Sequence, residues 1–252
     1  KRQASCGMIP VISSFAPFVS RRNCDQLMIS VAYAKQNVKI IGSDPGINAE
    51  TNGGTHMPFE DIGVLRSIPT IVIVEVADPE QLRQAVPAMI RHNGPVYLRM
   101  ARKEQPAVFD SSYHFDLFKA DLLREGSDVT ILATGLLLSR ALEAAELLEN
   151  EGIRAEVINV HTIKPLDQET ILASVKKTGC VVTAENHNVI GGLYSAVSEL
   201  LAANQPAPIE RVGIEDEFGE VGNLAALSKR YHLNAEDIVN KAKFAVGTKE
   251  KE

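Results

Sequence analysis

Residues 70–100 read TIVIVEVADPEQLRQAVPAMIRHNGPVYLRM, and this stretch decides the fold class. TIVIVEV and PVYLRM are short runs rich in apolar residues and bounded by Gly, Pro or Asn, which is typical of buried strands. Between them, Asp78 stands at a helix N-cap position and Pro79 at the first helical position, so a helix is predicted there. A strand, a helix and another strand in succession predict a largely parallel sheet covered by helices.

The same alternation continues on both sides of this stretch. MIPVISS and VKIIGS are predicted strands, and RRNCDQLMISVAYAKQ between them is a predicted helix with Leu27, Val31 and Ala34 on one face. Further along, DVTILATG, AEVINV, CVVTAE and PIERVGI alternate with helical segments, the last of which has Asn234 and Asp237 spaced as in a capping box. The sequence therefore predicts an α/β protein of two three-layer α/β domains with mostly parallel sheets.

Breaks in the alternation mark the expected domain boundaries. We expect residues 1–105 to form the first domain and residues 106–126, which mix Pro, Ser, Asp and isolated aromatics, to form a linker. Residues 127–246 are expected to form the second domain, and GTKEKE, residues 247–252, a disordered tail.

Composition argues against several classes of protein. With 252 residues, of which 45% are hydrophobic, the chain can bury one large core or two ordinary ones. A net charge of -6 without a long basic run argues against nucleic acid as a partner. No apolar run approaches the roughly twenty residues of a membrane-spanning helix. Cys6, Cys24 and Cys180 lack ligand spacing, so we expect reduced, mostly buried thiols and a cytoplasmic location.

A histidine lies in a glycine-containing loop after a predicted strand. The loop ETNGGTHMPFED, residues 50–61, follows VKIIG, so in a parallel sheet it lies at the carboxyl edge, where ligands of open α/β folds bind. Gly53 and Gly54 permit a sharp turn or a close approach to a ligand. His56 could then donate hydrogen bonds or transfer a proton, or it could simply satisfy a turn carbonyl on the surface.

Two other strand ends carry candidate binding residues. Phe15 and Phe18 follow the first predicted strand and could form a stacking platform for a planar heterocycle, although helix packing is the alternative. Arg99 and Arg102 end another strand, where a guanidinium could bind a phosphate or carboxylate in a fork, or could be merely solvated.

These stretches together resemble a known family. VISSFAPFVSRRNCDQL, GSDPGINAETNGGTHMPFEDIGVLRSIPTIVIVEVADPEQL, PVYLRMAR, VHTIKPLD and TAENHNVIGGL are similar, in this order, to the C-terminal half of transketolases. The similarity is strongest to the split form, in which that half is a separate subunit. The resemblance implies a pyrimidine-binding domain for thiamine diphosphate, followed by the transketolase C-terminal domain. It also implies transfer of a two-carbon ketol unit from a ketose, often a phosphate, to an aldose acceptor.

The resemblance assigns a role to each candidate residue. Phe15 and Phe18 match the aromatic pair that packs on the aminopyrimidine ring of the cofactor. His56 matches the loop histidine that hydrogen-bonds the hydroxyls of the donor sugar and could assist proton transfer.

Three more positions match substrate-binding positions of the family. Asn52 stands where an aspartate commonly contacts a hydroxyl of the donor ketose. Arg102 matches an arginine that holds the terminal phosphate of the substrate. Asp44 stands where a histidine is common on the phosphate side, and a carboxylate facing a phosphate is repulsive.

The resemblance also implies a partner chain. The diphosphate-binding half, with its Mg²⁺ ligands, and the glutamate that activates the cofactor have no match in these 252 residues, so the first domain is expected to be N-terminally incomplete. We therefore expect a heteromer with a diphosphate-binding N-terminal transketolase subunit, within a heterotetramer in which this chain also pairs with itself, and no metal ligand on this chain.

Two alternative functions remain open. The first is a related thiamine enzyme subunit, either a 2-oxo acid dehydrogenase β subunit or a deoxyxylulose phosphate synthase. The second is a catalytically silent partner that only stabilises an assembly. In the second domain, Glu185 and His187 stand at a strand end and could pair, and we expect them to have a structural or interface role.

Overall fold

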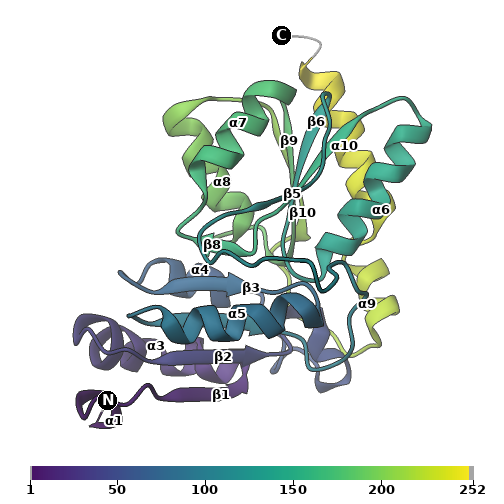
Figure 1. Cartoon of the computed structure of the whole chain (residues 1–252). Coiled ribbons are helices and arrows are strands. Elements are labelled where there is room, and N and C mark those ends of the chain that lie inside the picture. Colours follow the sequence, from purple (N-terminus) through teal and green to yellow (C-terminus); the bar gives the residue numbers. More distant parts are fainter. Residues whose placement is uncertain (1, 250–252) are drawn as a thin grey trace.

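The computed structural model describes residues 2–249 and contains two five-stranded sheets flanked by helices (Figure 1). The first sheet has the order β1-β2-β4-β3-β8. Its strands are β1 (Val11–Phe15), β2 (Lys39–Ser43), β3 (Val72–Glu75), β4 (Val96–Met100) and β8 (Thr162–Lys164). β1 to β4 pair in parallel, and β8 pairs with β3 in the antiparallel direction.

Helical segments cover both faces of the first sheet. They are α1 (Arg2–Ser5), α2 (Ala16–Val19), η1 (Arg21–Asn23), α3 (Cys24–Gln26), η2 (Leu27–Tyr33), η3 (Gly46–Asn52), α4 (Asp61–Arg66) and α5 (Pro79–Arg91). Leu27, Ile62 and Leu65 pack against one face, whereas Ala85 and Met89 of α5 pack against the other. The predicted start of α5 is confirmed, because Asp78 Oδ1 accepts a hydrogen bond from Gln81 N at 2.8 Å.

The predicted helix over residues 21–36 differs in form. It is divided into η1, α3 and the π-helix η2. A π-helix makes bonds from i to i+5, so its buried face recurs at a wider spacing than that of an α-helix. Leu27, Val31 and Ala32 are buried, whereas Ala34, expected on the same face, is only half-buried.

The second sheet has the order β10-β9-β6-β7-β5. Its strands are β5 (Asp121–Arg124), β6 (Val129–Ala133), β7 (Ala155–Asn159), β9 (Val181–Asn188) and β10 (Ile209–Ile214), all parallel except β5. α6 (Leu137–Asn150) and α10 (Ala235–Lys249) cover one face, α7 (Gln168–Thr178) and α8 (Leu193–Asn204) cover the other, and α9 (Leu224–Arg230) borders the first domain. The predicted fold class, two α/β domains with mostly parallel sheets, is confirmed.

The two domains are joined more closely than the sequence indicates. β8 lies beyond the expected boundary yet completes the first sheet, and Lys164 Nζ donates to the carbonyl oxygens of Arg66 and Ile68. β5 lies inside the expected linker and is part of the second sheet.

The end of the chain also differs from expectation. Residues 247–249, expected in the disordered tail, form the last turn of α10, and residues 250–252 lie outside the described part. Lys249 Nζ anchors this turn by donating to the carbonyl oxygens of Asp128 at 2.9 Å and Thr178 at 3.0 Å.

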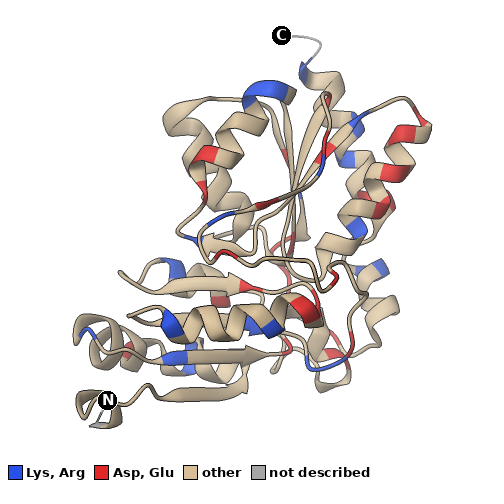
Figure 2. Cartoon of the chain, viewed as in Figure 1, with Lys and Arg blue, Asp and Glu red and all other residues tan. Residues whose placement is uncertain are grey.

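Charged residues and cysteines are distributed over both domains. Acidic and basic residues are interspersed along the whole fold (Figure 2). Cys6, Cys24 and Cys180 are free thiols, but only Cys180 is buried, so the expectation of mostly buried thiols was wrong. Within residues 2–249, no helix is long and apolar enough to cross a membrane.

Candidate active site

The candidate residues gather at the carboxyl edge of the first sheet. Phe15 is the last residue of β1, Asp44 directly follows β2, and Arg102 lies two residues after β4. The loop with Asn52 and His56 connects β2 to α4. Since β1, β2 and β4 are adjacent and parallel, their carboxyl ends bring these residues to one edge.

Three aromatic rings form the centre of the site. The ring of His56 lies 5.0 Å from the ring of Phe15 and 5.0 Å from that of Phe18, both edge to face. The two phenyl rings are 6.0 Å apart, also edge to face. All three side chains are half-buried, so the cluster is packed and still reachable from solvent.

Asp44 pairs with Arg102 beside this cluster. The Asp44 carboxylate accepts from Arg102 N at 2.9 Å and forms an ion pair with Arg102 Nε. The guanidinium carbon lies 4.5 Å from the centre of the Phe15 ring. The side chain of Asp44 is 4% exposed and that of Arg102 is 56% exposed, so Asp44 orients Arg102 and Arg102 faces solvent.

His56 lies in a loop tied to the first domain. Its Nδ1 is 2.9 Å from Thr55 Oγ1, and Arg21 Nη2 donates to the Thr55 carbonyl at 3.1 Å. Arg21 also forms an ion pair with Glu60 at 2.8 Å. Within the described part of the chain, His56 Nε2 has no hydrogen-bond partner, which makes it the ring nitrogen available to a ligand.

The glycines near His56 permit a turn and a close approach to the second domain. Gly53 has a φ of +70°, in line with the sharp turn expected. A Cβ on Gly53 would lie 2.9 Å from Val221 Cγ2, and a Cβ on Gly54 would lie 2.4 Å from the Gly219 carbonyl oxygen. The absence of side chains therefore lets this loop pass against the second domain. Asn52 is exposed, and its Nδ2 donates to the Ala49 carbonyl at 2.9 Å, which leaves Oδ1 for another donor.

Arg99 is not part of the solvent-accessible site. Its side chain is fully buried, donates to both carboxylate oxygens of Asp61 at 2.8 Å and 3.1 Å, and lies 2.7 Å from Glu75 Oε1. Of the two arginines that could bind an anion, only Arg102 can reach one. The sequence contains a signal for this difference between the two arginines. Arg99 lies within PVYLRM, an apolar run typical of a strand buried on both faces, whereas Arg102 follows that run.

Glu185 and His187 form part of a buried polar junction, and the sequence did not indicate that Asn186 between them also contacts the first domain. Glu185 Oε1 and Oε2 accept from the first backbone N–H groups of α8, at 2.8 Å from Tyr194 N and 2.6 Å from Leu193 N. Burial raises the pKa of Glu185 to about 8 and lowers that of His187 to about 4. Both side chains are fully buried, in line with the structural or interface role expected for them.

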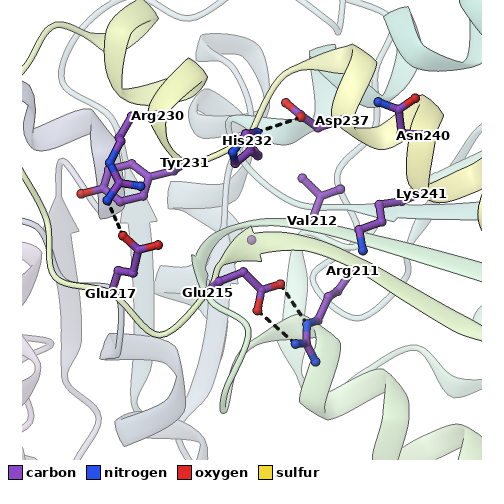
Figure 3. A pocket seen from close by; sticks show the side chains of 11 residues that line it. Arg211, Val212, Glu215, Glu217, Arg230, Tyr231, His232, Asp237, Asn240 and Lys241 are labelled. Atoms are coloured by element: carbon purple, nitrogen blue, oxygen red, sulfur yellow. Dashed lines mark hydrogen bonds and ion pairs between the residues drawn. The ribbon is translucent and has the colours of Figure 1, made fainter.

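A cavity lies in the second domain, between β10, the end of α9 and α10 (Figure 3). It has a volume of about 320 Å³. Its cationic side chains are already paired: Arg211 with Glu215 at 3.0 Å, Arg230 with Glu217, and Lys241 with Glu210 at 2.9 Å. Each cation of this cavity is thus balanced by a carboxylate, and among the described residues no aromatic pair like that of Phe15 and Phe18 lines the cavity.

Two family models match the chain, one on each domain. The model of the transketolase pyrimidine binding domain matches residues 3–107, and that of the transketolase C-terminal domain matches residues 118–238. The chain belongs to the transketolase family.

Similar proteins include subunits of other transketolases. The 6-deoxy-6-sulfo-D-fructose transketolase subunit SqwH of Clostridium sp. (strain MSTE9) is 54% identical over 95% of this chain and 74% of its own length. An apulose-4-phosphate transketolase subunit of Phocaeicola vulgatus is 36% identical over 90% of this chain and 73% of its own length. A solved split gene transketolase, described as an inactive beta4 tetramer, matches with a TM-score of 0.90 and 39% identity, over 98% of this chain and 78% of that one.

Membership of the transketolase family implies thiamine diphosphate as cofactor. The half-buried Phe15 and Phe18 rings beside His56 present an aromatic, mainly apolar surface, which fits the planar aminopyrimidine ring of that cofactor. Among residues 2–249, no group of three or more His, Cys, Asp or Glu side chains is arranged to hold a metal ion.

Proposed function

We propose that this chain is the C-terminal subunit of a thiamine diphosphate-dependent transketolase. It helps to transfer a two-carbon ketol unit from a ketose donor to an aldose acceptor. The observation that carries the proposal is the cluster of Phe15, Phe18, His56, Arg102 and Asp44 at one sheet edge. In this cluster an aromatic surface, a histidine and a solvent-facing guanidinium are in contact.

The residues of the cluster have separate roles in this proposal. Phe15 and Phe18 hold the aminopyrimidine ring, and the bound cofactor supplies the carbon nucleophile that accepts the ketol unit. His56 Nε2 hydrogen-bonds hydroxyl groups of the transferred unit and moves a proton there. Asn52 Oδ1 accepts a hydrogen bond from a donor hydroxyl.

Arg102 binds the distal anion of the donor, and Asp44 limits the charge of that anion. The Asp44 carboxylate already balances the positive charge of the guanidinium and repels an anion bound beside it. This repulsion is stronger for a doubly charged anion than for a singly charged one. A sulfonate carries one negative charge, whereas a phosphate carries about 1.5 to 2 at neutral pH. We therefore propose a donor ketose with a singly charged group, and the 54% identity to a 6-deoxy-6-sulfo-D-fructose transketolase subunit supports this choice.

The proposed enzyme contains a second kind of subunit. Several relatives are named as subunits of transketolases, and a solved relative is a split gene transketolase. We propose that a diphosphate-binding N-terminal subunit supplies the Mg²⁺ ligands, and that two copies of each chain form a heterotetramer.

A reconstituted transfer assay tests the proposed function. The chain is mixed with a diphosphate-binding subunit, thiamine diphosphate and Mg²⁺, and ketol transfer to an aldose is measured from 6-deoxy-6-sulfofructose and from fructose 6-phosphate. We expect a higher kcat/KM with the sulfonate. Asp44→Asn removes the carboxylate charge but keeps an acceptor for Arg102 N, so it should improve the phosphate relative to the sulfonate by about tenfold. Decarboxylation of a 2-oxo acid without ketol transfer would contradict the proposal.

A further inference from the structure

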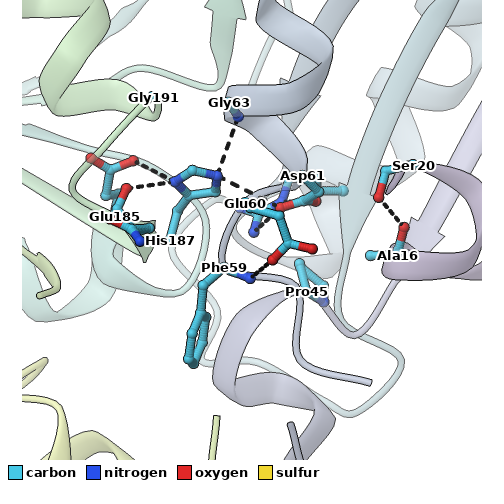
Figure 4. Close-up of polar contacts among 12 residues, drawn as sticks. Ala16, Ser20, Pro45, Phe59, Glu60, Asp61, Gly63, Glu185, His187 and Gly191 are labelled. Atoms are coloured by element: carbon cyan, nitrogen blue, oxygen red, sulfur yellow. Dashed lines mark hydrogen bonds and ion pairs between the residues drawn. The ribbon is translucent and has the colours of Figure 1, made fainter. Parts of the chain in front are cut away.

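The loop that carries the candidate site is held by the second domain. The end of β9 contacts the loop and the helix that follows it: Asn188 N donates to the Phe59 carbonyl at 2.8 Å, and Gly63 N of α4 donates to His187 Nε2 at 3.3 Å. Figure 4 shows His187 between Glu185 and the start of α4, with Phe59, Glu60 and Pro45 close by. The loop therefore lies between the carboxyl edge of the first sheet and the second domain and contacts both.

Asn186 makes the most specific of these contacts. Its side chain is fully buried, its Oδ1 accepts from Ile47 N at 3.0 Å, and its Nδ2 donates to the Pro45 carbonyl at 3.0 Å. Gly46 lies between these two groups with φ of +55°, and a Cβ there would lie 2.1 Å from Asn186 Oδ1. The amide thus uses its acceptor and a donor on the two sides of one glycine and fixes the turn 45–47.

The fixed turn directly follows Asp44. Asp44 has a φ of 51°, in the left-handed region, which is uncommon for residues with a Cβ although Asp and Asn adopt it more readily than others. One restraint is the hydrogen bond from Asp44 N to the Met100 carbonyl at 2.9 Å, and the other is the turn held by Asn186. From this conformation the Asp44 carboxylate reaches both the backbone N–H and the guanidinium of Arg102.

We propose that Asn186 is a positioning residue for the distal-anion subsite. Its amide fixes the turn 45–47, the turn holds Asp44 in the left-handed conformation, and Asp44 orients Arg102. That Arg102 binds the anion of the donor rests on the proposed function. The rings of Phe15 and Phe18 contact His56 and one another, and in the described part of the chain no ring contact or hydrogen bond joins them to the turn that Asn186 holds. Asn186 therefore affects affinity for the anion and leaves affinity for the cofactor unchanged.

Asn188 provides a matched control on the same strand. It also makes two side-chain hydrogen bonds, from its Nδ2 to Asp216 at 3.0 Å and from Ile190 N to its Oδ1 at 2.8 Å, but both stay within the second domain. Asn188→Ala therefore removes a similar number of contacts and leaves the turn 45–47 in place.

The first measurement is amide hydrogen exchange on the full chain, which needs no activity. We expect Asn186→Ala to speed exchange in residues 44–49 at least tenfold and Asn188→Ala to leave it unchanged. Gly46→Ala, which drives a methyl group into the Asn186 amide, should speed exchange in the same segment and replaces Asn186→Ala if that variant does not fold. Unchanged exchange in the folded variant would overturn the proposal, whether or not the chain is a transketolase.

The second measurement is kinetic, on the reconstituted complex. Asn186→Ala should raise KM for the anionic donor about tenfold, with less than a twofold change in kcat and in the dissociation constant of thiamine diphosphate. In an Arg102→Ala background, Asn186→Ala should have no further effect on KM, because the group that it positions is gone. An equal rise in KM in both backgrounds, or parallel losses of kcat and cofactor affinity, would show a general structural role instead. Absence of transfer in the unmutated complex would contradict the proposed function alone.

Discussion

Arg99 and Arg102 are three positions apart but have different surroundings in the structure. Arg99 is enclosed by the carboxylates of Asp61 and Glu75, and removing one partner from such a buried group leaves an uncompensated charge. Arg102 has one carboxylate partner and a side chain more than half exposed. The sequence alone assigns both arginines the same possible role, and burial decides between them.

His56 and Phe15 are expected to affect different steps. In the reconstituted complex, His56→Ala should lower kcat about a hundredfold, as expected for loss of proton transfer, with little change in cofactor affinity. Phe15→Ala should weaken thiamine diphosphate binding about fivefold, since an aromatic contact contributes about 1 kcal/mol. Steady-state kinetics and calorimetry on both variants check this. If His56→Ala abolishes cofactor binding, or Phe15→Ala leaves it intact, the two roles are misassigned.

Residues at strand ends could be predicted from the sequence, but their partners could not. Phe15 and Phe18 were placed after one predicted strand and His56 in a loop after the next, and in the structure their three rings are in contact. The pairing of Asp44 with Arg102 joins positions 58 apart, and the contact of Asn186 with Ile47 joins positions 139 apart. No periodicity in the chain predicts such contacts, because the first arises when β2 and β4 pair within the first sheet and the second arises when the domains dock.

Among the elements, β9 contributes most to the junction of the domains. It pairs with β6 and β10, and its last residues reach the loop after β2. The run CVVTAE predicts the first part of this strand, whereas its extension through Asn188 depends on packing against the first domain. Likewise, the apolar pattern of η2 predicts a helix, and its π form is not visible in the composition of the segment.

The burial of His187 in β9 predicts a loss of stability in acid. Burial lowers the pKa of His187 from 6.5 to about 4, although Asp61 and Glu185 lie 3.9 Å and 3.8 Å from its ring nitrogens. Between pH 6.5 and 4 the unfolded chain binds more protons than the folded chain at this residue. The contribution of His187 to the free energy of unfolding therefore falls as the pH drops through that window, by on the order of 3 kcal/mol in total. Glu185, with its pKa raised to about 8, contributes with the opposite sign as the pH drops from 8 towards 4.5.

Urea unfolding at several pH values measures this effect. Relative to the unmutated chain, His187→Gln should gain stability as the pH falls from 6.5 to 4, because it lacks the His187 contribution. His232→Gln, which changes an 81% exposed side chain, should keep the pH slope of the unmutated chain. Equal slopes for all three proteins would mean that His187 is not the responsible group.

At the scale of the whole molecule, the two domains form one connected body. β8 belongs to the second domain by its place in the chain and to the first sheet by its pairing (Figure 1). The division into two α/β domains could be predicted because strand and helix periodicities are local. The pairing of β8 with the first sheet could not be predicted. A run as short as TIK, residues 162–164, contains no information about which sheet it joins.

The most direct test of the account is calorimetric titration of thiamine diphosphate with Mg²⁺. The ligand is titrated into the full-length chain alone, and then into its mixture with a diphosphate-binding subunit. The account predicts saturable binding in the mixture only, together with ketol transfer from an anionic ketose, because the aromatic cluster holds one end of the cofactor and the partner holds the other. Absence of binding in the mixture would contradict the central claim and would indicate a partner that only stabilises an assembly.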